Sequence, residues 1–369
     1  MEIKKSGATL SKIVQIGEKL KRLTAQTGQE YLPLNRGVNS VVNVDLQSVA
    51  NGLDFNSTRM QVYPPGPGFA ELREAINQEY FCGQSSKENI LITAGGMNAL
   101  DLVIQTVAIK KLYLPIYYWG CYFHLLTIRG VGNGEYTAHS ELYNMIDELK
   151  GSGVLICDPG NPLGEKYDDQ EMFRLVKTLS DAGVVVFFDS PYRRIFLDGT
   201  DDYYSRLMEL DNVIITESFS KSVGLSGQRL GFIHTTDRAV HDEAEIRLMY
   251  CTNGVNAFAQ EAVLSLLTSS EGRKAASDFK QATRADIALN IEYLDKRGLL
   301  AREFYNTSTP RGIFAVVNKT EDELLEHYIG SVSLSFFTKS DKERASRYAR
   351  ICVSMPHAKF VKFFDSVPV

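Results

Sequence analysis

Residues 213–231 of the chain read VIITESFSKSVGLSGQRLG. The segment opens with the apolar run Val213–Thr216, which is typical of a buried strand. Lys221 follows that run among small and hydroxyl-bearing residues, and Arg229 lies eight residues later between glycines. A lone lysine is usually a solvated surface group. One that follows a buried strand in these surroundings is less easily explained at the surface, and it is a candidate for a ligand site.

Around this segment, short apolar runs alternate with longer amphipathic ones. The runs 91–93, 111–115, 154–157, 184–189 and 213–216 are predicted strands, and the segments 97–108, 169–182 and 237–250 are predicted helices between them. Strands that alternate with helices indicate an α/β domain with a mostly parallel sheet. A first helix is predicted at 11–27, a long helical stretch at 257–297, and strand-like pieces at 313–317 and 350–354 before a final helix.

Two strand ends carry candidate ligand contacts, because ligands of α/β sheets bind beyond the carboxyl ends of the strands. The strand 90–93 runs into Gly95-Gly96-Met97 and a helix. Free N–H groups at a helix N-terminus favour a phosphate, although a Gly-Gly turn is more often plain chain geometry. The strand 111–115 runs into Ile116-Tyr117-Tyr118-Trp119, a cluster that either packs in the core or places one ring against a planar ligand.

Two further strand ends carry polar side chains. Residues 158–164 read DPGNPLG, a dense turn signal, in which Asn161 either completes a tight loop or reaches a ligand. The strand 184–188 is followed by Asp189-Ser190-Pro191-Tyr192. A carboxylate after five apolar residues needs a positive partner, and a protonated pyridine nitrogen would be one. A helix-capping role for Asp189 is the alternative.

Composition narrows the function classes. The chain has 369 residues and a formal net charge of −5, with Lys and Arg scattered along it, so we expect neither nucleic acid nor a membrane as a partner. The five cysteines fit neither a disulfide framework nor a zinc pattern, and no metal site is expected. The N-terminus lacks the apolar core of a signal peptide. We therefore expect a soluble, cytoplasmic protein.

Taken together and in order, these elements resemble a known family. They are YPPGPG at 63–68 with Leu72-Arg73, GGM at 95–97, NPLG at 161–164, DSPY at 189–192, SFSK at 218–221 and GQRLG at 227–231. The chain from about Tyr63 to Arg350 resembles the fold-type I enzymes that use pyridoxal 5′-phosphate (PLP), specifically the class I and II aminotransferases. The resemblance implies a large α/β domain with a mostly parallel seven-stranded sheet between helices, at residues 55–250. It also implies a smaller α+β domain built from both chain ends, at 1–54 and 251–369.

The resemblance implies roles around the cofactor ring. Lys221 would carry PLP as a Schiff base and act as the general base once freed. Asp189 would keep the ring nitrogen protonated, so that the ring acts as an electron sink. Tyr192 and Asn161 would hydrogen-bond the phenolic oxygen. Tyr117 would stack on the ring, with Tyr118 as the alternative.

The remaining roles concern the phosphate and the subunit boundary. Arg229 would hold the phosphate with its planar fork. The Ser218 and Ser220 hydroxyls and the Gly95-Gly96-Met97 turn would complete the cup. Tyr63 resembles the tyrosine that reaches a neighbouring subunit's phosphate, which implies a homodimer with shared active sites.

On the substrate side, Arg350 resembles the arginine that binds the α-carboxylate, with Arg347 as a nearby alternative. Gly37 matches the glycine over the substrate more loosely, and Asn161 would also face the substrate. The region before Tyr63 and the stretch 331–347 depart from the family pattern. Both regions shape the substrate pocket, and no second arginine for a dicarboxylate is evident.

The leading hypothesis is an aminotransferase that moves an amino group between an α-amino acid and a 2-oxo acid. The alternative on the same scaffold is a β- or γ-lyase, a decarboxylase or an enzyme that modifies an amino acid, since the cofactor motifs do not separate them. A PLP-binding regulator is disfavoured because no basic helix-turn-helix extension precedes the domain. A catalytically inactive protein is disfavoured because Lys221, Asp189 and Arg229 are all present.

Overall fold

A computed structural model describes residues 1–197 and 201–369. Its centre is a seven-stranded sheet of order β2-β9-β8-β7-β5-β3-β4. Within that sheet only β9 runs antiparallel to its neighbours, so the predicted mostly parallel sheet is confirmed. The strands are β2 (Ile90–Thr93), β3 (Lys111–Pro115), β4 (Gly132–Tyr136), β5 (Gly153–Cys157), β7 (Val185–Asp189), β8 (Val213–Ser218) and β9 (Gly231–His234).

Burial on both faces explains the composition of the central strands. Every residue of β5 and β8 is buried, as are Val186 to Asp189 of β7. Parallel strands covered on both faces need near-continuous apolar side chains, and VLIC, VVFF and VII supply them. The polar residues that end β7 and β8 are therefore buried too, at the carboxyl edge of the sheet.

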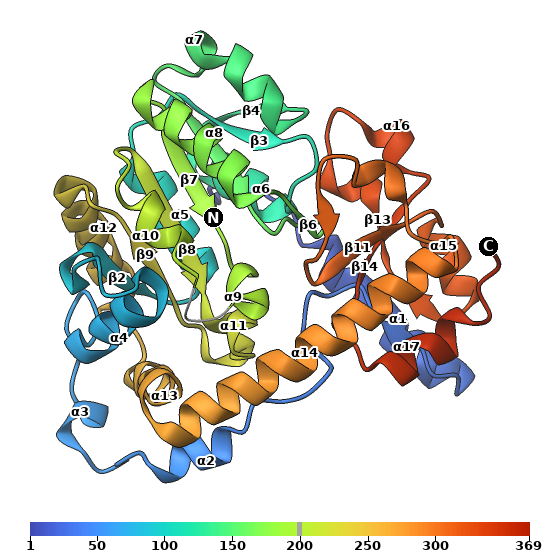
Figure 1. The fold of residues 1–369 in the computed structure, drawn as a ribbon, viewed down its shortest axis with the longest axis horizontal. Coiled ribbons are helices and arrows are strands. Elements are labelled where there is room, and N and C mark those ends of the chain that lie inside the picture. The colour runs from blue at the N-terminus through green and yellow to red at the C-terminus, as the bar shows by residue number, and fades with distance from the viewer. Residues whose placement is uncertain (198–200) are drawn as a thin grey trace.

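Helices cover the sheet and link its strands (Figure 1). In the large domain they are α2 (Leu46–Asn51), α3 (Thr58–Gln61), α4 (Ala70–Phe81), α5 (Gly96–Thr106), α6 (Gly120–Arg129), α7 (Ile146–Leu149), α8 (Asp169–Asp181), α9 (Arg193–Phe196), α10 (Tyr203–Leu207), α11 (Phe219–Ser222), α12 (Arg238–Thr252) and α13 (Ala257–Thr268). Both α8 and α12 begin at an aspartate, Asp168 and Asp237, whose side chain accepts hydrogen bonds from the first free N–H groups.

The smaller domain combines both chain ends, as Figure 1 shows in blue and red. A three-stranded antiparallel sheet has the order β11-β14-β13, and β1 pairs with β12 in parallel. The elements are α1 (Lys12–Thr27), β1 (Leu32–Pro33), β11 (Phe314–Val317), α15 (Glu321–Glu326), β12 (Ile329–Gly330), β13 (Val332–Ser333), α16 (Lys342–Ala345), β14 (Ala349–Cys352) and α17 (His357–Phe364).

The expected domain boundary at residue 251 precedes a stretch of helix that contacts elements of both domains. The predicted stretch 257–297 is two helices, and the first, α13, packs against α4 of the large domain. The second, α14 (Ser270–Lys296), starts beside α13 and α2 and continues to α17 of the small domain (Figure 1). The α2 segment, expected in the small domain, also lies with α13. The chain therefore passes between domains within α14.

A short pair of strands joins the two domains near the NPLG turn. β6 (Glu165–Lys166) pairs antiparallel with β10 (Thr309–Pro310). Gly164 has a φ of 70°, and a Cβ there would lie 1.9 Å from the Phe314 carbonyl oxygen. Only glycine fits this left-handed position at such close approach, which keeps the turn carrying Asn161 against β11.

None of the helices in the described parts of the chain combines the length and apolar character that crossing a lipid bilayer requires.

Candidate active site

The carboxyl edge of the sheet carries a buried acid. Asp189, at the end of β7, is 3% exposed. It accepts a hydrogen bond from the Thr216 hydroxyl of β8 at 2.9 Å and one from the Tyr122 hydroxyl of α6 at 2.5 Å. Thr216 is the register partner of Asp189 in the sheet, so strand pairing itself brings the two side chains together.

Asp189 has no cationic partner among the residues that the structure describes. Burial is the dominant effect and raises the pKa of its carboxyl from 3.8 to about 6, although the two hydroxyl donors oppose the rise. A buried carboxylate with hydroxyl donors alone is suited to bind a cation brought by a ligand.

Beside Asp189, the Asn161 amide donates a hydrogen bond to the Tyr192 hydroxyl at 3.3 Å. The amide oxygen of Asn161 is buried and has no hydrogen-bond partner in the described structure. Burial raises the pKa of the Tyr192 phenol well above its usual range. The pair thus offers a neutral hydroxyl and a free acceptor from two loops, 158–164 and 189–192, that end neighbouring strands.

The start of α5 and the loop after β8 form an anion cradle. A Cβ on Gly95 would lie 2.7 Å from an Arg229 guanidinium nitrogen, and one on Gly96 would lie 3.1 Å from the Ser218 Cβ. Arg229 also donates to the Ser220 hydroxyl at 3.3 Å. Free N–H groups at the first turn of a helix attract a phosphate, and here a guanidinium and two serine hydroxyls adjoin them. Met97 lies in that first turn.

Lys221 lies on α11, which the Ser218 hydroxyl caps by accepting from the Ser220 N–H. Its ammonium donates a hydrogen bond to the carbonyl oxygen of Gly37. Burial lowers the pKa of Lys221, and the nearby guanidiniums of Arg229 and Arg350 lower it further. Gly37 of the N-terminal segment thus lies against Lys221.

Arg350, on β14, is 1% exposed and has no carboxylate partner among the described residues. It donates to the Asn35 carbonyl oxygen at 2.9 Å, while its Nε has no partner. Phe314 and Phe337 flank its guanidinium, with ring centroids at 4.4 and 4.9 Å. Burial lowers its pKa to about 10. Arg347, the alternative, is exposed.

The aromatic cluster after β3 differs from the expectation. The Tyr117 hydroxyl donates to Asp341 at 2.5 Å, and its ring packs edge-on against Phe304, so Tyr117 faces the small domain. Trp119 lies instead edge-on to Tyr122, the tyrosine that donates to Asp189, with ring centroids 5.5 Å apart. Tyr118, the second choice, lies near Glu135. The structure therefore does not bring Tyr117 to the Asp189 cluster.

Tyr63 lies away from these residues on the surface. It is 80% exposed and lines an open cavity of about 1200 Å³ with residues 60–64 and 252–258. Within one chain it does not reach the Arg229 cradle.

Comparison with known proteins agrees with this geometry. Residues 32–367 match the family model described as aminotransferase class I and II. The chain belongs to this family. It is 24% identical to the aspartate aminotransferase of Pyrococcus horikoshii over 274 residues, covering 69% of this chain and 67% of that protein. It is 25% identical to the histidinol-phosphate aminotransferase of Flavobacterium psychrophilum over 290 residues, covering 72% and 80%.

Solved structures of such aminotransferases share the fold. An aspartate aminotransferase of Thermus thermophilus, determined with maleate, superposes with a TM-score of 0.81 at 18% identity, covering 97% of this chain and 96% of that one. An aminotransferase of Mycobacterium tuberculosis gives a TM-score of 0.81 at 17% identity, covering 99% and 97%. The predicted family, the fold-type I architecture and the aminotransferase activity are thus confirmed for this chain.

Sequence reasoning missed the aminotransferase's hydroxyl partners of Asp189. Thr216 is visible as the polar residue level with Asp189 on the next predicted strand. Tyr122 follows Trp119, the chain's one tryptophan, by three residues, a spacing that places both on one face of a helix.

Asp189 gives a pH dependence with a defined sign. Its carboxyl pKa is raised in the folded protein, so the contribution of Asp189 to the free energy of unfolding is largest below pH 4 and falls as pH rises from there to about 6. We expect Asp189→Asn to remove this loss in cofactor-free protein. Urea unfolding should show wild type losing about 3 kcal/mol relative to the variant between pH 4 and 7. A difference that stays constant with pH would contradict the assignment.

Proposed function

We propose that the chain binds PLP through Lys221 and uses it to move an amino group between an α-amino acid and a 2-oxo acid. The observation that carries the proposal is Asp189, a buried carboxylate without a cationic partner among the described residues. A protonated pyridine nitrogen would supply that partner. Lys221 and Arg229 both lie in the segment that connects β8, the strand beside Asp189, to β9.

The side chains fit the different parts of PLP. Arg229, Ser218, Ser220 and the Gly95-Gly96-Met97 turn would hold the phosphate, because a Cβ at Gly95 would fill the space beside the guanidinium. Tyr192 and Asn161 would hold the phenolic oxygen, to which the tyrosine hydroxyl and the amide N–H can donate. We assign the ring face to Trp119 in place of Tyr117, since Trp119 packs on the tyrosine that contacts Asp189.

When bound, PLP supplies an electron sink for bonds at the substrate's α-carbon. The chain's own part is to move the α-proton. Burial and two neighbouring guanidiniums lower the pKa of Lys221, so a larger share of its amine is neutral and able to take that proton. The Gly37 carbonyl oxygen holds the Lys221 nitrogen by a hydrogen bond.

Arg350 would bind the α-carboxylate that amino acids and 2-oxo acids share. Its guanidinium is held by the Asn35 carbonyl and two aromatic rings, and its Nε remains free to donate. A carboxylate in this desolvated setting gains a strong, charge-assisted pair. Gly37 and Asn161 lie near the same space, next to Lys221 and Tyr192.

Tyr63 supports a homodimer in which each subunit completes its neighbour's phosphate site. Its ring is exposed together with two apolar side chains that line the same cavity, Phe55 and Val62. Apolar surface gathered in this way is typical of an interface with another chain.

The absorbance spectrum of the PLP-loaded protein tests the central proposal. We expect a visible band that borohydride fixes covalently onto Lys221, and that Lys221→Ala lacks. One amino acid should bleach the band and a 2-oxo acid should restore it. The exposed Lys177→Ala is the control and should behave as wild type. Release of ammonia or carbon dioxide with no need for a 2-oxo acid would contradict amino transfer.

The two arginines on either side of β14's start give a matched pair. Arg350→Gln should raise KM for the amino donor at least about tenfold, because a buried charge-assisted pair is lost. Arg347→Gln should leave KM unchanged. The lysine-bound cofactor spectrum serves as the folding control, and equal KM values in the two variants would overturn the role of Arg350.

Tyr63 and Tyr250 are exposed to similar extents. Variants at the two positions therefore distinguish a specific contact with the cofactor phosphate from a general effect of changing a surface tyrosine. We expect sedimentation to give twice the 41.3 kDa mass of the chain. Tyr63→Phe should weaken PLP binding about tenfold through one lost hydrogen bond, while Tyr250→Phe should not. A monomer that binds PLP equally well with Phe at position 63 would contradict shared sites.

A further inference from the structure

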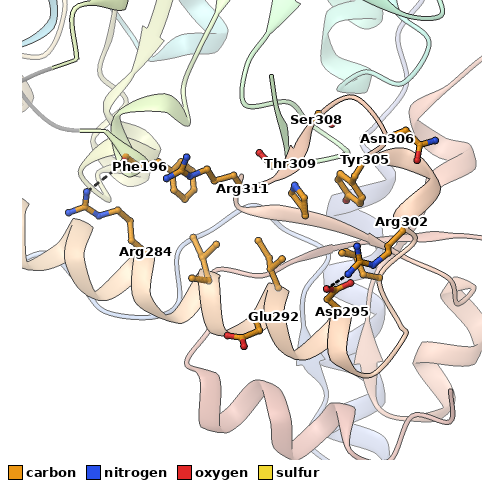
Figure 2. A pocket seen from close by; sticks show the side chains of 15 residues that line it. Phe196, Arg284, Glu292, Asp295, Arg302, Tyr305, Asn306, Ser308, Thr309 and Arg311 are labelled. Carbon is orange, nitrogen blue, oxygen red and sulfur yellow. Dashed lines mark hydrogen bonds and ion pairs between the residues drawn. The ribbon is translucent and has the colours of Figure 1, made fainter. Parts of the chain in front are cut away.

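A second cavity lies between the domains, outside the proposed cofactor site. Its volume is about 850 Å³, and its walls are α14, the end of α9 and the segment 300–311 (Figure 2). None of the residues assigned to PLP or to the substrate carboxylate lines it.

The floor of this cavity is apolar. Ile287, Ala288 and Ile291 succeed one another on one face of α14, and Leu300 and Tyr305 continue the surface from the small domain. Ile287 and Leu300 are buried, whereas Ala288 is exposed at the mouth. A ligand with an apolar body would cover this floor and remove it from water.

The charged residues of the lining lie in two groups, one at each end of the cavity. Figure 2 shows Arg284 and Arg311 near Phe196 at one end of the cavity, and the Arg302–Asp295 ion pair at the other. The Glu292 side chain points away from the cavity and pairs with Lys296. The carboxylates of the lining are therefore each matched by a base, whereas Arg311 adds a positive charge near Phe196.

Arg311 is the basic residue of the lining for which no carboxylate partner is found in the described ranges. Its side chain is exposed and makes no hydrogen bond or ion pair with any residue in the described ranges. Its backbone, by contrast, is held firmly, since its N–H donates to the Gly164 carbonyl at 3.0 Å. Arg284 lies beside it and donates to the Phe196 carbonyl at 3.4 Å.

We propose that this interdomain cavity is a binding site for a small carboxylate with an apolar body. The guanidinium of Arg311 binds the carboxylate, for which its planar fork is geometrically matched. The apolar body lies along Ile287, Ile291 and Leu300. A cationic ligand is disfavoured, because Arg311 would repel it and both acids of the lining are already paired.

The cavity is distinct from the proposed substrate site, but its wall is hydrogen-bonded to the turn that carries Asn161. The Tyr305 hydroxyl, in the cavity wall, donates to the Leu163 carbonyl at 2.8 Å, and the Gly312 N–H donates to the Gly164 carbonyl at 2.7 Å. A ligand here would therefore contact Tyr305 and Arg311, which both hydrogen-bond to the turn that carries Asn161.

Calorimetric titration of the full-length protein with 4-phenylbutanoate tests the proposal, with 4-phenylbutanamide as the uncharged analogue. We expect the carboxylate to bind and the amide to bind at least about tenfold more weakly, the cost of one charge-assisted pair. Arg311→Gln and Ala288→Trp, which fills the mouth, should weaken the carboxylate by a similar factor. Arg174→Gln, the same charge change on α8, should have no effect.

An Arg350→Gln variant separates this site from the substrate site. Retained affinity in that variant supports the interdomain cavity. Affinity that is lost there but kept in Arg311→Gln would overturn the proposal, as would equal binding of acid and amide, or no binding to wild type at millimolar concentration. Because no turnover is measured, the result is independent of the PLP reaction, and circular dichroism checks that each variant is folded.

Discussion

The burial of one carboxylate, that of Asp189, governs the arrangement of this active site. A carboxylate removed from water is costly unless polar groups and a cation compensate it. The sheet provides Thr216 by strand register, and α6 provides the Tyr122 hydroxyl. The described residues do not provide the cation, so a ligand with a cationic group would complete the energetic balance at this sheet edge.

The basic groups of the site show the complementary pattern. Lys221 and Arg350 are deeply placed, and both are held by main-chain carbonyl oxygens of the N-terminal segment, at Gly37 and Asn35. A carbonyl orients a cation without neutralising it. Both pKa values are lowered as a result of burial, and both side chains keep their capacity for an anionic or electrophilic partner. The N-terminal segment thus contributes to the site through its backbone carbonyls.

The sequence was sufficient for the residues whose positions follow from strand ends. Asp189, Asn161, Lys221 and the Gly95-Gly96 turn lie where apolar strands stop, and their order along the chain is specific. The position of the Tyr117 ring could not be predicted in this way, because the direction of each aromatic ring after β3 depends on where α6 begins. Trp119 precedes the first residue of that helix and lies against Tyr122, while Tyr117 lies against the small domain.

The position at which the chain passes from one domain to the other could not be predicted from the sequence either. The helical pattern runs through 257–297, across both α13 and α14, and does not indicate which domain each helical turn contacts. The Arg350 environment depends on Phe314 and Phe337, which approach only when β11 and the segment after β13 are in place. Contacts between elements far apart in the chain decide these details, and local periodicity carries no record of them.

The continuous helix α14 has a mechanical consequence. Its 27 residues span about 40 Å, and it is packed against large-domain helices at one end and α17 at the other. Relative motion of the domains must therefore bend an intact hydrogen-bonded rod, and helices without a proline curve only gently. Because one unbroken helix connects the two domains, rotation of the small domain would be small in amplitude. Bending the helix would also produce a restoring force that returns the domain to its starting position.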